Sequence, residues 1–600
     1  MRYMNRSKEL WMLPLALALL LSACKKDFLE QKKLSAIDEE GVFSDSIRSR
    51  GMLNNLYSNI GMSFNSRRYS NTPLDAATDD AEPNLYDNAI ATFYTYRLSN
   101  GAINSSNTDK DVWTRCFQMI RAANIYIKNK DKVPVTNVTK DFWHGQVRFL
   151  RAWYYFTLLK HYGGIPLIGD KVFEGDELID VQRSSYEDCV NYIVSELDAA
   201  AALLPATFEP GSQENLRVSK GTALAVKSRV LLYAASPLFN AGARADDPDH
   251  YVSYPSSDNE RWKKAADAAK AVISLNVYRL YTLGATPFYE QFLKNVPQDL
   301  PEAVFLYWQP QNTANNFYVE NSANPVSRGT NNGYQGSAKY VPTQELVDAF
   351  GMKNGLPISD PASGYTDGDN MYKNRDPRLT FTVHYNGALR YMGGAFGDQP
   401  VYTYTGVIPV STNRSVTSAI DDGMYRPTGT PTGYFRFKSM NNFGTGSGSE
   451  LYRPWTLMRY AEVLLNAAEA TNEYSGPSAE VYGWLKEIRE RAKIDAGANG
   501  LFGLKANMTR EEMRDVIRNE RRTELAFEEH RFWDVRRWKI APETENRETH
   551  GMEITRDASG KYSYRRVVVR KHTFTDAMYF FPIPQSEIVR SPALKQNPGY

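Results

Sequence analysis

The densest group of residues that could perform chemistry lies near the carboxyl end of the chain. Glu520, Glu524 and Glu528 follow one another at four-residue intervals, which places them on one face of a helix. Carboxylates arranged in this way could serve as a general acid and a general base. However, Glu520 and Glu524 continue an apolar helical stripe, and buried charges persist only when they are paired. We therefore interpret the cluster as a structural ion-pair network. Three arginines are candidate partners for its carboxylates: Arg459, Arg489 and Arg521.

The usual signatures of other catalytic sites are absent from the sequence. It contains no His-Glu-x-x-His, no Gly-x-Ser-x-Gly, no phosphate loop and no dinucleotide fingerprint. The seven histidines are scattered singly, and we interpret His161 and His530 as structural residues rather than metal ligands. No cofactor is expected. A glycoside hydrolase needs only two carboxylates at a set separation, so a secreted glycoside hydrolase with a helical scaffold remains the alternative to a binding protein.

The amino end predicts the compartment in which the protein works. Three basic residues precede an apolar run over residues 10–21, which Leu21-Ser22-Ala23-Cys24 closes. This pattern is typical of a secretory signal peptide, here residues 1–23. The run is too short to cross a bilayer core of about 30 Å, which needs roughly 20 residues. The tetrapeptide resembles the lipobox of bacterial lipoproteins, and we therefore expect Cys24 to carry lipid and to anchor the protein to a membrane.

Charge and cysteine content exclude two further classes of protein. The chain has 71 basic and 69 acidic residues without a basic block, which argues against a nucleic-acid partner. Apart from Cys24, only Cys116 and Cys189 are present, too few for a disulfide framework in a chain of this length. The fold must therefore rest on a hydrophobic core.

Hydrophobic periodicity predicts helices at both ends of the chain and irregular structure between them. Apolar residues at three- and four-residue steps indicate helices near residues 53–60, 113–127, 149–158, 190–204, 262–273, 457–468 and 481–492. Capping signals appear at Ser184 to Glu187, at Ser219 and at Thr509 with Glu512, where a last helix should run to about Lys539. Four tryptophans in or beside these stripes are expected in the core: Trp113, Trp143, Trp153 and Trp262.

These elements predict a mainly α protein, built on a scaffold of tetratricopeptide-like helical pairs. We expect an N-terminal helical part over residues 24–280 with a ligand-binding segment near 65–100. An irregular, loop-rich ligand-binding region containing short strands should follow over 281–451, where short apolar runs alternate with Gly, Asn, Ser and Pro. A C-terminal helical part should occupy residues 452–600.

Blocks spread over almost the whole mature chain resemble the SusD/RagB family. They lie at residues 148–156, 162–167, 220–230, 458–469, 518–534 and 581–600, beginning with Arg148-Phe-Leu-Arg-Ala-Trp-Tyr-Tyr-Phe156 and ending with Gln596-Asn-Pro-Gly-Tyr600. The resemblance implies an all-helical scaffold of tetratricopeptide-like pairs with an irregular ligand-binding region. It also implies a protein that docks on a SusC-like TonB-dependent transporter, and that binds its ligand rather than cleaving it.

Two aromatic stretches outside the helical stripes are the candidate ligand sites. Tyrosine and tryptophan combine an apolar body with a polar tip, which suits stacking against the flat CH faces of sugars in water. The resemblance further implies ligand contacts just after the acidic pair Asp79-Asp80, which points to Tyr86 and Asn88. The predicted ligand-binding residues are Arg68, Tyr69, Tyr86, Asn88, Trp308, Tyr318 and Tyr334.

From these observations we expect a nutrient-binding lipoprotein of the outer membrane that faces the cell exterior. It should capture an oligosaccharide or a peptide for import through the transporter, without acting as an enzyme.

Overall fold

The computed structural model describes the chain from Glu39 to Tyr600 with internal gaps. The described residues are 39–62, 72–85, 89–174, 177, 179–208, 212, 214–294, 299–307, 339–391, 398–406, 429–440 and 454–600. Cys24 and the predicted signal peptide lie outside them.

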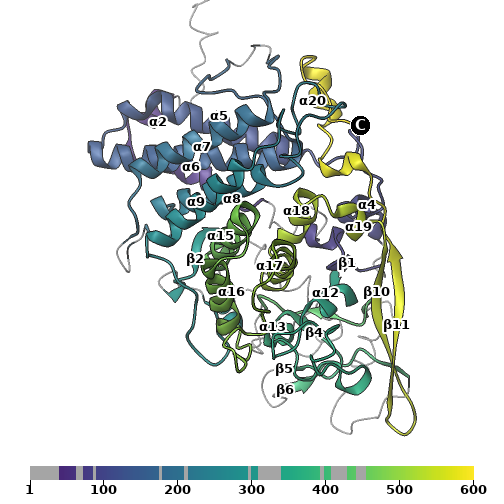
Figure 1. Ribbon diagram of the computed structural model, residues 1–600. Coiled ribbons are helices and arrows are strands. Elements are labelled where there is room, and N and C mark those ends of the chain that lie inside the picture. The colour runs from purple at the N-terminus through teal and green to yellow at the C-terminus, as the bar shows by residue number, and fades with distance from the viewer. Residues whose placement is uncertain are drawn as a thin grey trace, which may run out of the picture.

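Long helices stack side by side to form the scaffold, here called the helical stack (Figure 1). In chain order they are α3 (Ser46–Tyr57), α5 (Asp111–Asn129), α6 (Asn137–Tyr162), α7 (Tyr186–Leu203), α8 (Lys220–Ala235), α9 (Glu260–Ser274), α15 (Tyr460–Ser475), α16 (Ala479–Arg491) and α17 (Arg510–Glu524). Neighbours in this order pack on one another, from α5 on α6 to α15 on α16 and α17. This is the arrangement expected of tetratricopeptide-like pairs, and the predicted fold class is confirmed.

Helix α9 packs directly on α15, although residues 275–459 separate the two in the chain. The loop-rich middle of the protein is therefore an insertion between two neighbouring helices of a continuous stack, and we call residues 275–459 the insertion. It occupies the lower part of Figure 1 together with its short helices. The predicted helical parts before and after it build one scaffold rather than two.

Shorter helices decorate the stack and the insertion. They are α2 (Glu39–Phe43), α4 (Tyr94–Ser99), α10 (Pro287–Glu290), α12 (Gln344–Ala349), α13 (Pro377–Thr382), α18 (His530–Arg537), α19 (Ala541–Glu545) and α20 (Gln585–Arg590). Single turns of 3-10 helix add to them, among them η3 (Leu74–Ala77) and η9 (Gly368–Asn370). None of the described helices is both long and apolar enough to span a membrane.

The strands form small, separate sheets. They are β1 (Ala81–Pro83), β2 (Ala303–Tyr307), β3 (Tyr340–Pro342), β4 (Val383–His384), β5 (Leu389–Tyr391), β6 (Asp398–Pro400), β7 (Thr405–Gly406), β8 (Phe435–Arg436), β9 (Trp455–Arg459), β10 (Glu548–Arg556) and β11 (Tyr562–Lys571). β1 pairs with β3, β2 with β9, β4 with β8 and β5 with β6, all antiparallel. β10 and β11 form a long antiparallel hairpin, which β7 joins along β10 in parallel. Figure 1 shows this hairpin running down one side of the molecule.

One large hydrophobic core fills the helical stack, and a smaller one fills the lower part of the molecule. The large core draws residues from Phe43 to Leu594, so both ends of the chain share it. Trp113, Trp143 and Trp153 lie within it, and Trp262 is buried between α8, α9 and α15, as the sequence predicted. Cys116 and Cys189 are buried thiols that are not joined in a disulfide.

Two helix boundaries differ from the prediction. The cap of α7 is Ser185, whose hydroxyl accepts the backbone N–H of Asp188, because Ser184 is instead hydrogen-bonded through its backbone to Ile165. The last helix does not reach Lys539 in one piece. α17 ends at Glu524 and α18 begins at His530, because Phe527 and Glu529 take left-handed backbone conformations between them. The caps at Ser219 and at Thr509 with Glu512 are confirmed.

The hairpin β10–β11 was not predicted by the sequence analysis. Its second strand alternates between half-buried and exposed residues over much of its length, as a strand with one face against the protein should. The C-terminal part therefore contains a substantial strand pair in addition to its helices.

Candidate functional site

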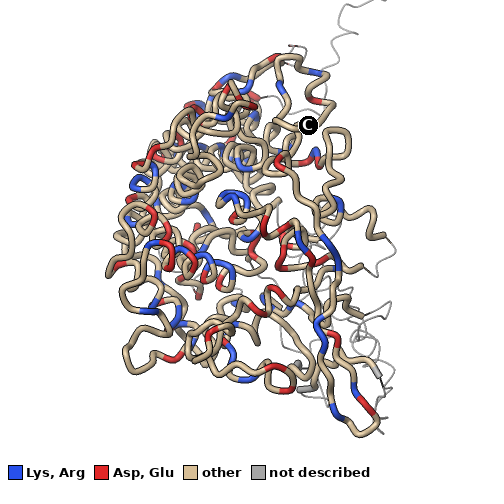
Figure 2. The backbone as a smooth tube through the Cα atoms, turned by 45° about the vertical axis from the view of Figure 1, so that its right-hand side comes forward, with Lys and Arg blue, Asp and Glu red and all other residues tan. Residues whose placement is uncertain are grey.

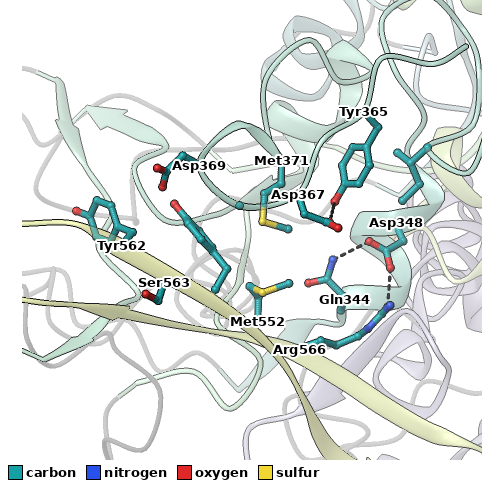
Figure 3. A pocket seen from close by; sticks show the side chains of 13 residues that line it. Gln344, Asp348, Tyr365, Asp367, Asp369, Met371, Met552, Tyr562, Ser563 and Arg566 are labelled. Carbon is teal, nitrogen blue, oxygen red and sulfur yellow. Dashed lines mark hydrogen bonds and ion pairs between the residues drawn. The ribbon is translucent and has the colours of Figure 1, made fainter. Parts of the chain in front are cut away.

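A pocket of about 720 Å³ opens between the insertion and the hairpin β10–β11 (Figure 3). Its volume falls in the range of about 300–1,000 Å³ that is typical of sites for small ligands. Three segments line it, namely helix α12, the loop that leads through η9, and the facing strands of the hairpin. The residues concerned are Gln344, Asp348, Ile358, Tyr365, Asp367, Gly368, Asp369, Met371, Met552, Tyr562, Ser563, Tyr564 and Arg566.

Local structure determines which side chains reach the pocket. Alternate residues of a strand point to the same face, and Tyr562, Tyr564 and Arg566 therefore project together from β11. Across the hairpin, Arg566 pairs in register with Met552 of β10. Thr343 caps α12 by accepting the N–H of Leu346, which fixes Gln344 and Asp348 at the other side of the pocket.

Asp348 is held by a chain of hydrogen bonds from the interior. The amide of Gln344 donates to one of its carboxylate oxygens at 2.7 Å, and Arg566 forms an ion pair with the other at 2.5 Å. The amide oxygen of Gln344 in turn accepts the hydroxyl of buried Tyr434 at 2.6 Å. Both oxygens of Asp348 are engaged, so this carboxylate is a fixed acceptor that supports the wall of the pocket rather than a poised base.

Two further carboxylates, Asp367 and Asp369, line the pocket (Figure 3). The hydroxyl of Tyr365 donates to Asp367 at 2.9 Å. Burial raises the pKa of Tyr365, and the hydrogen bond to Asp367 raises it further. Burial, followed by a hydrogen bond to Asp369, likewise raises the pKa of Tyr564. Both phenols therefore remain protonated donors at neutral pH.

The tyrosines that line the pocket belong to a larger group of half-buried tyrosines. Every partly buried apolar side chain that packs on the lower core, among the described residues, is a tyrosine. We call these residues the tyrosine rim: Tyr365, Tyr372, Tyr385, Tyr402, Tyr562 and Tyr564. Tyr372 stacks on Tyr385 with ring centroids 4.1 Å apart, and Tyr562 lies 6.4 Å from Tyr564. Each ring has one side on the core and its edge or face directed toward water.

Such a surface suits a ligand with apolar faces and many hydroxyl groups. Aromatic rings can stack on the faces, while carboxylates, an amide and a guanidinium exchange hydrogen bonds with the hydroxyls. Within the described ranges no group of three or more His, Cys, Asp or Glu residues could hold a metal ion. The side chains that line the pocket could hold a polar organic molecule.

The predicted ligand-binding residues lie outside the described residues. This applies to Arg68, Tyr69, Tyr86, Asn88, Trp308, Tyr318 and Tyr334. Their described neighbours in the chain are brought together, however. Pro83 of β1 pairs with Tyr340 of β3, and the N–H of Asn84 donates to the carbonyl of Lys339 at 2.8 Å. The residues just before Tyr86 thus lie beside the residues that follow the predicted stretch at 308–334.

A second junction joins the other ends of those stretches. Tyr307 pairs in register with Trp455, its ring lies against Gly61, and its hydroxyl donates to the carbonyl of Ser58 at 3.2 Å. A side chain at Gly61 would collide with that ring, so only glycine allows this close approach. Residue 61, which precedes the predicted stretch at 67–96, and residue 307, which directly precedes the one at 308–334, are therefore in contact.

The acidic pair in the predicted segment has a structural role. Arg531 forms an ion pair with Asp79 at 2.8 Å, and Arg522 binds Asp80 at 2.6 Å. Burial opposes ionisation of Asp79, yet the charges of Arg522 and Arg531 hold its pKa below its ordinary value. The pair fastens the segment before β1 to helices α17 and α18.

The base of the hairpin is fastened by a second buried charge cluster. Glu82 of β1 accepts hydrogen bonds from His572 at 2.6 Å and from Thr549 at 2.5 Å, and forms an ion pair with Arg570 at 2.6 Å. Burial alone would raise the pKa of Glu82, but the charges of His572 and Arg570 lower it to about 2. Burial opposes the charge on His572, but Glu82 and Glu545 raise its pKa to about 9. The imidazole is therefore charged at neutral pH.

The cluster of carboxylates on α17 is confirmed as an ion-pair network. Glu524 is fully buried and pairs with Arg459 at 2.6 Å, with Arg378 at 3.0 Å and with Arg491. Glu520 pairs with Arg378 at 2.6 Å and with Arg489 at 2.8 Å. Burial would raise the pKa of Glu524, but the surrounding guanidinium groups hold it well below its usual range. Such a carboxylate cannot take up a proton as a general base near neutral pH.

This network lies between the stack and the insertion, and we call it the seam network. Its members are Glu302, Asp376, Arg378, Lys438, Arg459, Arg489, Arg491, Glu520, Glu524 and Glu528. Arg459 and Arg489 are partners, as predicted. Arg521 is not a partner of Glu524, because its side chain turns to Asp534 and Asn466 instead.

The histidines interpreted as structural are also accounted for. His161 and His530 are buried, the former bound to the carbonyl of Thr157 and the latter beside Glu462. Figure 2 shows acidic and basic residues interspersed along the described part of the backbone, in keeping with the near-zero net charge of the chain.

Comparison with known proteins places the chain among a group of binding proteins. A family model described as the SusD family matches residues 301–600. A second model, described as starch-binding and associating with the outer membrane, matches residues 27–232.

Individual relatives match over nearly their whole length. SusD-like protein P2 of Formosa agariphila is 24% identical over 590 residues, covering 97% of this chain and 98% of that protein. The crystal structure of a SusD-like protein from Bacteroides fragilis is 28% identical with a TM-score of 0.75, covering 94% and 99% of the two chains. A laminarin-binding SusD-like protein shares the fold with a TM-score of 0.57 at 20% identity, covering 93% of this chain and 100% of that one.

Proposed function

Since the chain belongs to the SusD family, we propose that it is a glycan-binding protein that captures oligosaccharides at the outer membrane for import. The observation that carries this proposal is the pocket beside β11, where three half-buried tyrosines stand next to carboxylates, an amide and a guanidinium. The laminarin-binding structural neighbour and the starch-binding description of the second family model agree with a carbohydrate ligand.

The proposal is tested by calorimetry with a panel of oligosaccharides. The expected result is a saturable heat of binding for the wild type with at least one oligosaccharide, and a several-fold weaker affinity in Tyr562→Ala. The panel also includes peptides of similar length, so that the experiment distinguishes a glycan-binding protein from a peptide-binding protein. Binding of peptides alone would contradict the proposal.

We further propose that the chain does not cleave its ligand. The strongest catalytic candidates, Glu520 and Glu524, are buried in ion pairs, and Asp348 in the pocket has both oxygens engaged. Prolonged incubation with each bound oligosaccharide should release no new reducing ends. A steady release that Asp367→Asn abolishes would favour the glycoside hydrolase instead.

The predicted platform of Tyr86 and Trp308 is proposed as part of the same binding surface. Support comes from the two junctions at β1–β3 and at Tyr307, where the described borders of the two stretches meet. Each ring should contribute about 0.5–1.5 kcal/mol, so either alanine variant should bind several-fold more weakly and the double variant weaker still. Unchanged affinity in the double variant would exclude this platform.

We propose that Cys24 carries the lipid anchor and that the partner is a SusC-like TonB-dependent transporter, with the protein facing the cell exterior. The lipobox-like residues 21–24 support the anchor. Labelling cells with a radioactive fatty acid should mark the wild type and leave Cys24→Ala unmarked and released from membranes. Co-purification of the transporter with the wild type, and cleavage of the protein by protease added outside intact cells, would support the remaining two points.

A further inference from the structure

Acidic side chains outnumber basic side chains among the residues that line the pocket. Asp348, Asp367 and Asp369 line it, whereas Arg566 is the single cation among its lining residues. Arg566 is already shared between Asp348 at 2.5 Å and Glu345 at 3.7 Å. Its positive charge is therefore balanced by the carboxylates next to it, and little remains for a ligand.

Asp367 and Asp369 are the two charges best placed to meet a ligand. Both line the pocket and are exposed, and neither forms an ion pair with a lysine or arginine among the described residues. Asp367 accepts a hydrogen bond from Tyr365, and Asp369 lies close to the phenol of Tyr564, so both carboxylates keep lone pairs for a ligand.

Three nearby arginines are engaged by groups other than these two carboxylates. Arg375 lies behind the ring of Tyr365, where it is buried and donates to the backbone carbonyls of residues 347, 350, 351 and 371. Arg565 is paired with Glu553. Arg556 lies over the rings of Tyr404 and Tyr562 and hydrogen-bonds to Tyr404 and to the carbonyl of Gly560.

The tyrosine rings add to the negative character of the site. The face of an aromatic ring carries the negative part of its quadrupole and attracts cations. The ring of Tyr365 lies beside Asp367 and that of Tyr564 beside Asp369. The rings of Tyr365 and Tyr562 each already have a guanidinium against them, from Arg375 and Arg556. Rings together with carboxylates attract an ammonium group, accept neutral hydroxyls, and repel carboxylate or sulfate.

We propose that this pocket selects glycans by charge, binding amine-bearing and neutral sugar units and rejecting units that carry carboxylate or sulfate. The inference rests on the proposed glycan-binding function and adds the chemical class of the ligand. It attributes the selection to Asp367 and Asp369, with the rings supplying affinity for the sugar itself.

The test uses three β-1,4-linked oligomers of equal length, built from glucosamine, glucose and glucuronate. Dissociation constants are measured by calorimetry on the full chain in detergent at low salt and at high salt. Affinity should fall from the glucosamine to the glucose to the glucuronate oligomer, by roughly fivefold for each step in charge. High salt should narrow these differences, because it screens exposed charges.

The variant Asp367→Asn with Asp369→Asn should bring the three affinities within about threefold of one another. The matched control is Glu511→Gln with Asp515→Asn on α17, which removes the same charge from residues that do not line the pocket and should keep the order. Glucuronate bound as tightly as glucose by the wild type would overturn the charge selection and leave the glycan-binding function standing. An order that survives in the pocket variant would overturn it as well. Failure of all three oligomers to bind would overturn the inference together with the function.

Discussion

The helical stack and the lower part of the molecule both contain many carboxylates and tyrosines, but they place them differently. In the stack and along its seam, glutamates such as Glu524 are buried and surrounded by guanidinium groups. Around the pocket, Asp367 and Asp369 stand at the surface beside half-buried rings. The partly buried side chains around the large core are of mixed type, whereas those around the lower core are all tyrosines within the described residues.

Burial, rather than residue type, therefore distinguishes the carboxylates that hold the fold together from those that are accessible to a ligand. A buried carboxylate with several cationic partners is fixed, and its removal leaves those cations unpaired. An exposed carboxylate beside a ring is free to meet a ligand, and its removal changes binding rather than folding. Substitutions on the two sides of this division should consequently have different effects.

The largest effect is expected for Glu524→Gln. The substitution leaves Arg459, Arg491 and Arg378 without their shared partner in a fully buried position, at a cost of roughly 3–5 kcal/mol in the free energy of unfolding. Denaturant unfolding followed by circular dichroism measures the loss. A midpoint equal to that of the wild type would mean that the seam network does not hold the insertion on the stack.

The next effect concerns pH and the base of the hairpin. The folded pKa of His572, about 9, lies above its ordinary value of 6.5, so its stabilising contribution is complete below about pH 6.5 and is lost as the pH rises through 9. Between these limits the wild type should lose on the order of 3 kcal/mol of unfolding free energy that His572→Gln does not lose. Unfolding curves at pH 6 and pH 10 for both proteins provide the measurement. Parallel losses in the two proteins would contradict the assignment.

A smaller effect, confined to binding, is expected at the tyrosine rim. Tyr562→Ala with Tyr564→Ala should weaken binding of a neutral oligosaccharide by about tenfold, because two stacking rings are removed. Tyr474→Ala on α15, which removes a half-buried ring from the stack, is the matched control and should leave affinity unchanged. If the two variants weaken binding equally, the tyrosines of the rim are no more important for binding than a tyrosine of the helical stack, which would contradict the comparison.

The smallest effect is expected for an exposed ion pair of the stack. Glu480 on α16 pairs with Lys270 at 2.6 Å, and the two side chains are 57% and 35% exposed. Glu480→Gln should change the free energy of unfolding by no more than about 0.5 kcal/mol, since exposed pairs contribute little. A loss as large as that of Glu524→Gln would show that charge alone, without burial, accounts for the first prediction.

The sequence predicted the helical scaffold because its signals are local. Apolar stripes and caps such as Ser219 and Thr509 lie within single helices, and helices begin directly after both caps. The break after α17 could not be predicted from such local sequence signals. Phe527 and Glu529 adopt left-handed conformations without a glycine to mark them, and a continuous amphipathic pattern passes over them.

The pocket was missed for a different reason. It brings Gln344 and Asp348 against Met552 and Arg566, and such contacts between distant segments leave no periodicity in the sequence. The alternating Tyr562-Ser563-Tyr564 was the one available signal, because rings on alternate residues of a polar strand point to the same side. The seam network was predicted in kind, but which arginine meets which glutamate is decided by packing, as Arg521 shows.

The direct packing of α9 on α15 has a consequence for how such a protein can diversify. The insertion is a loop whose two ends are held together by neighbouring helices. The entropy of closing a loop grows only with the logarithm of its length, so doubling it would cost only about 0.6 kcal/mol. The stack can therefore host insertions of very different length and sequence at nearly constant stability. The insertion, which forms one side of the proposed binding pocket, can therefore change in evolution while the helical stack stays the same.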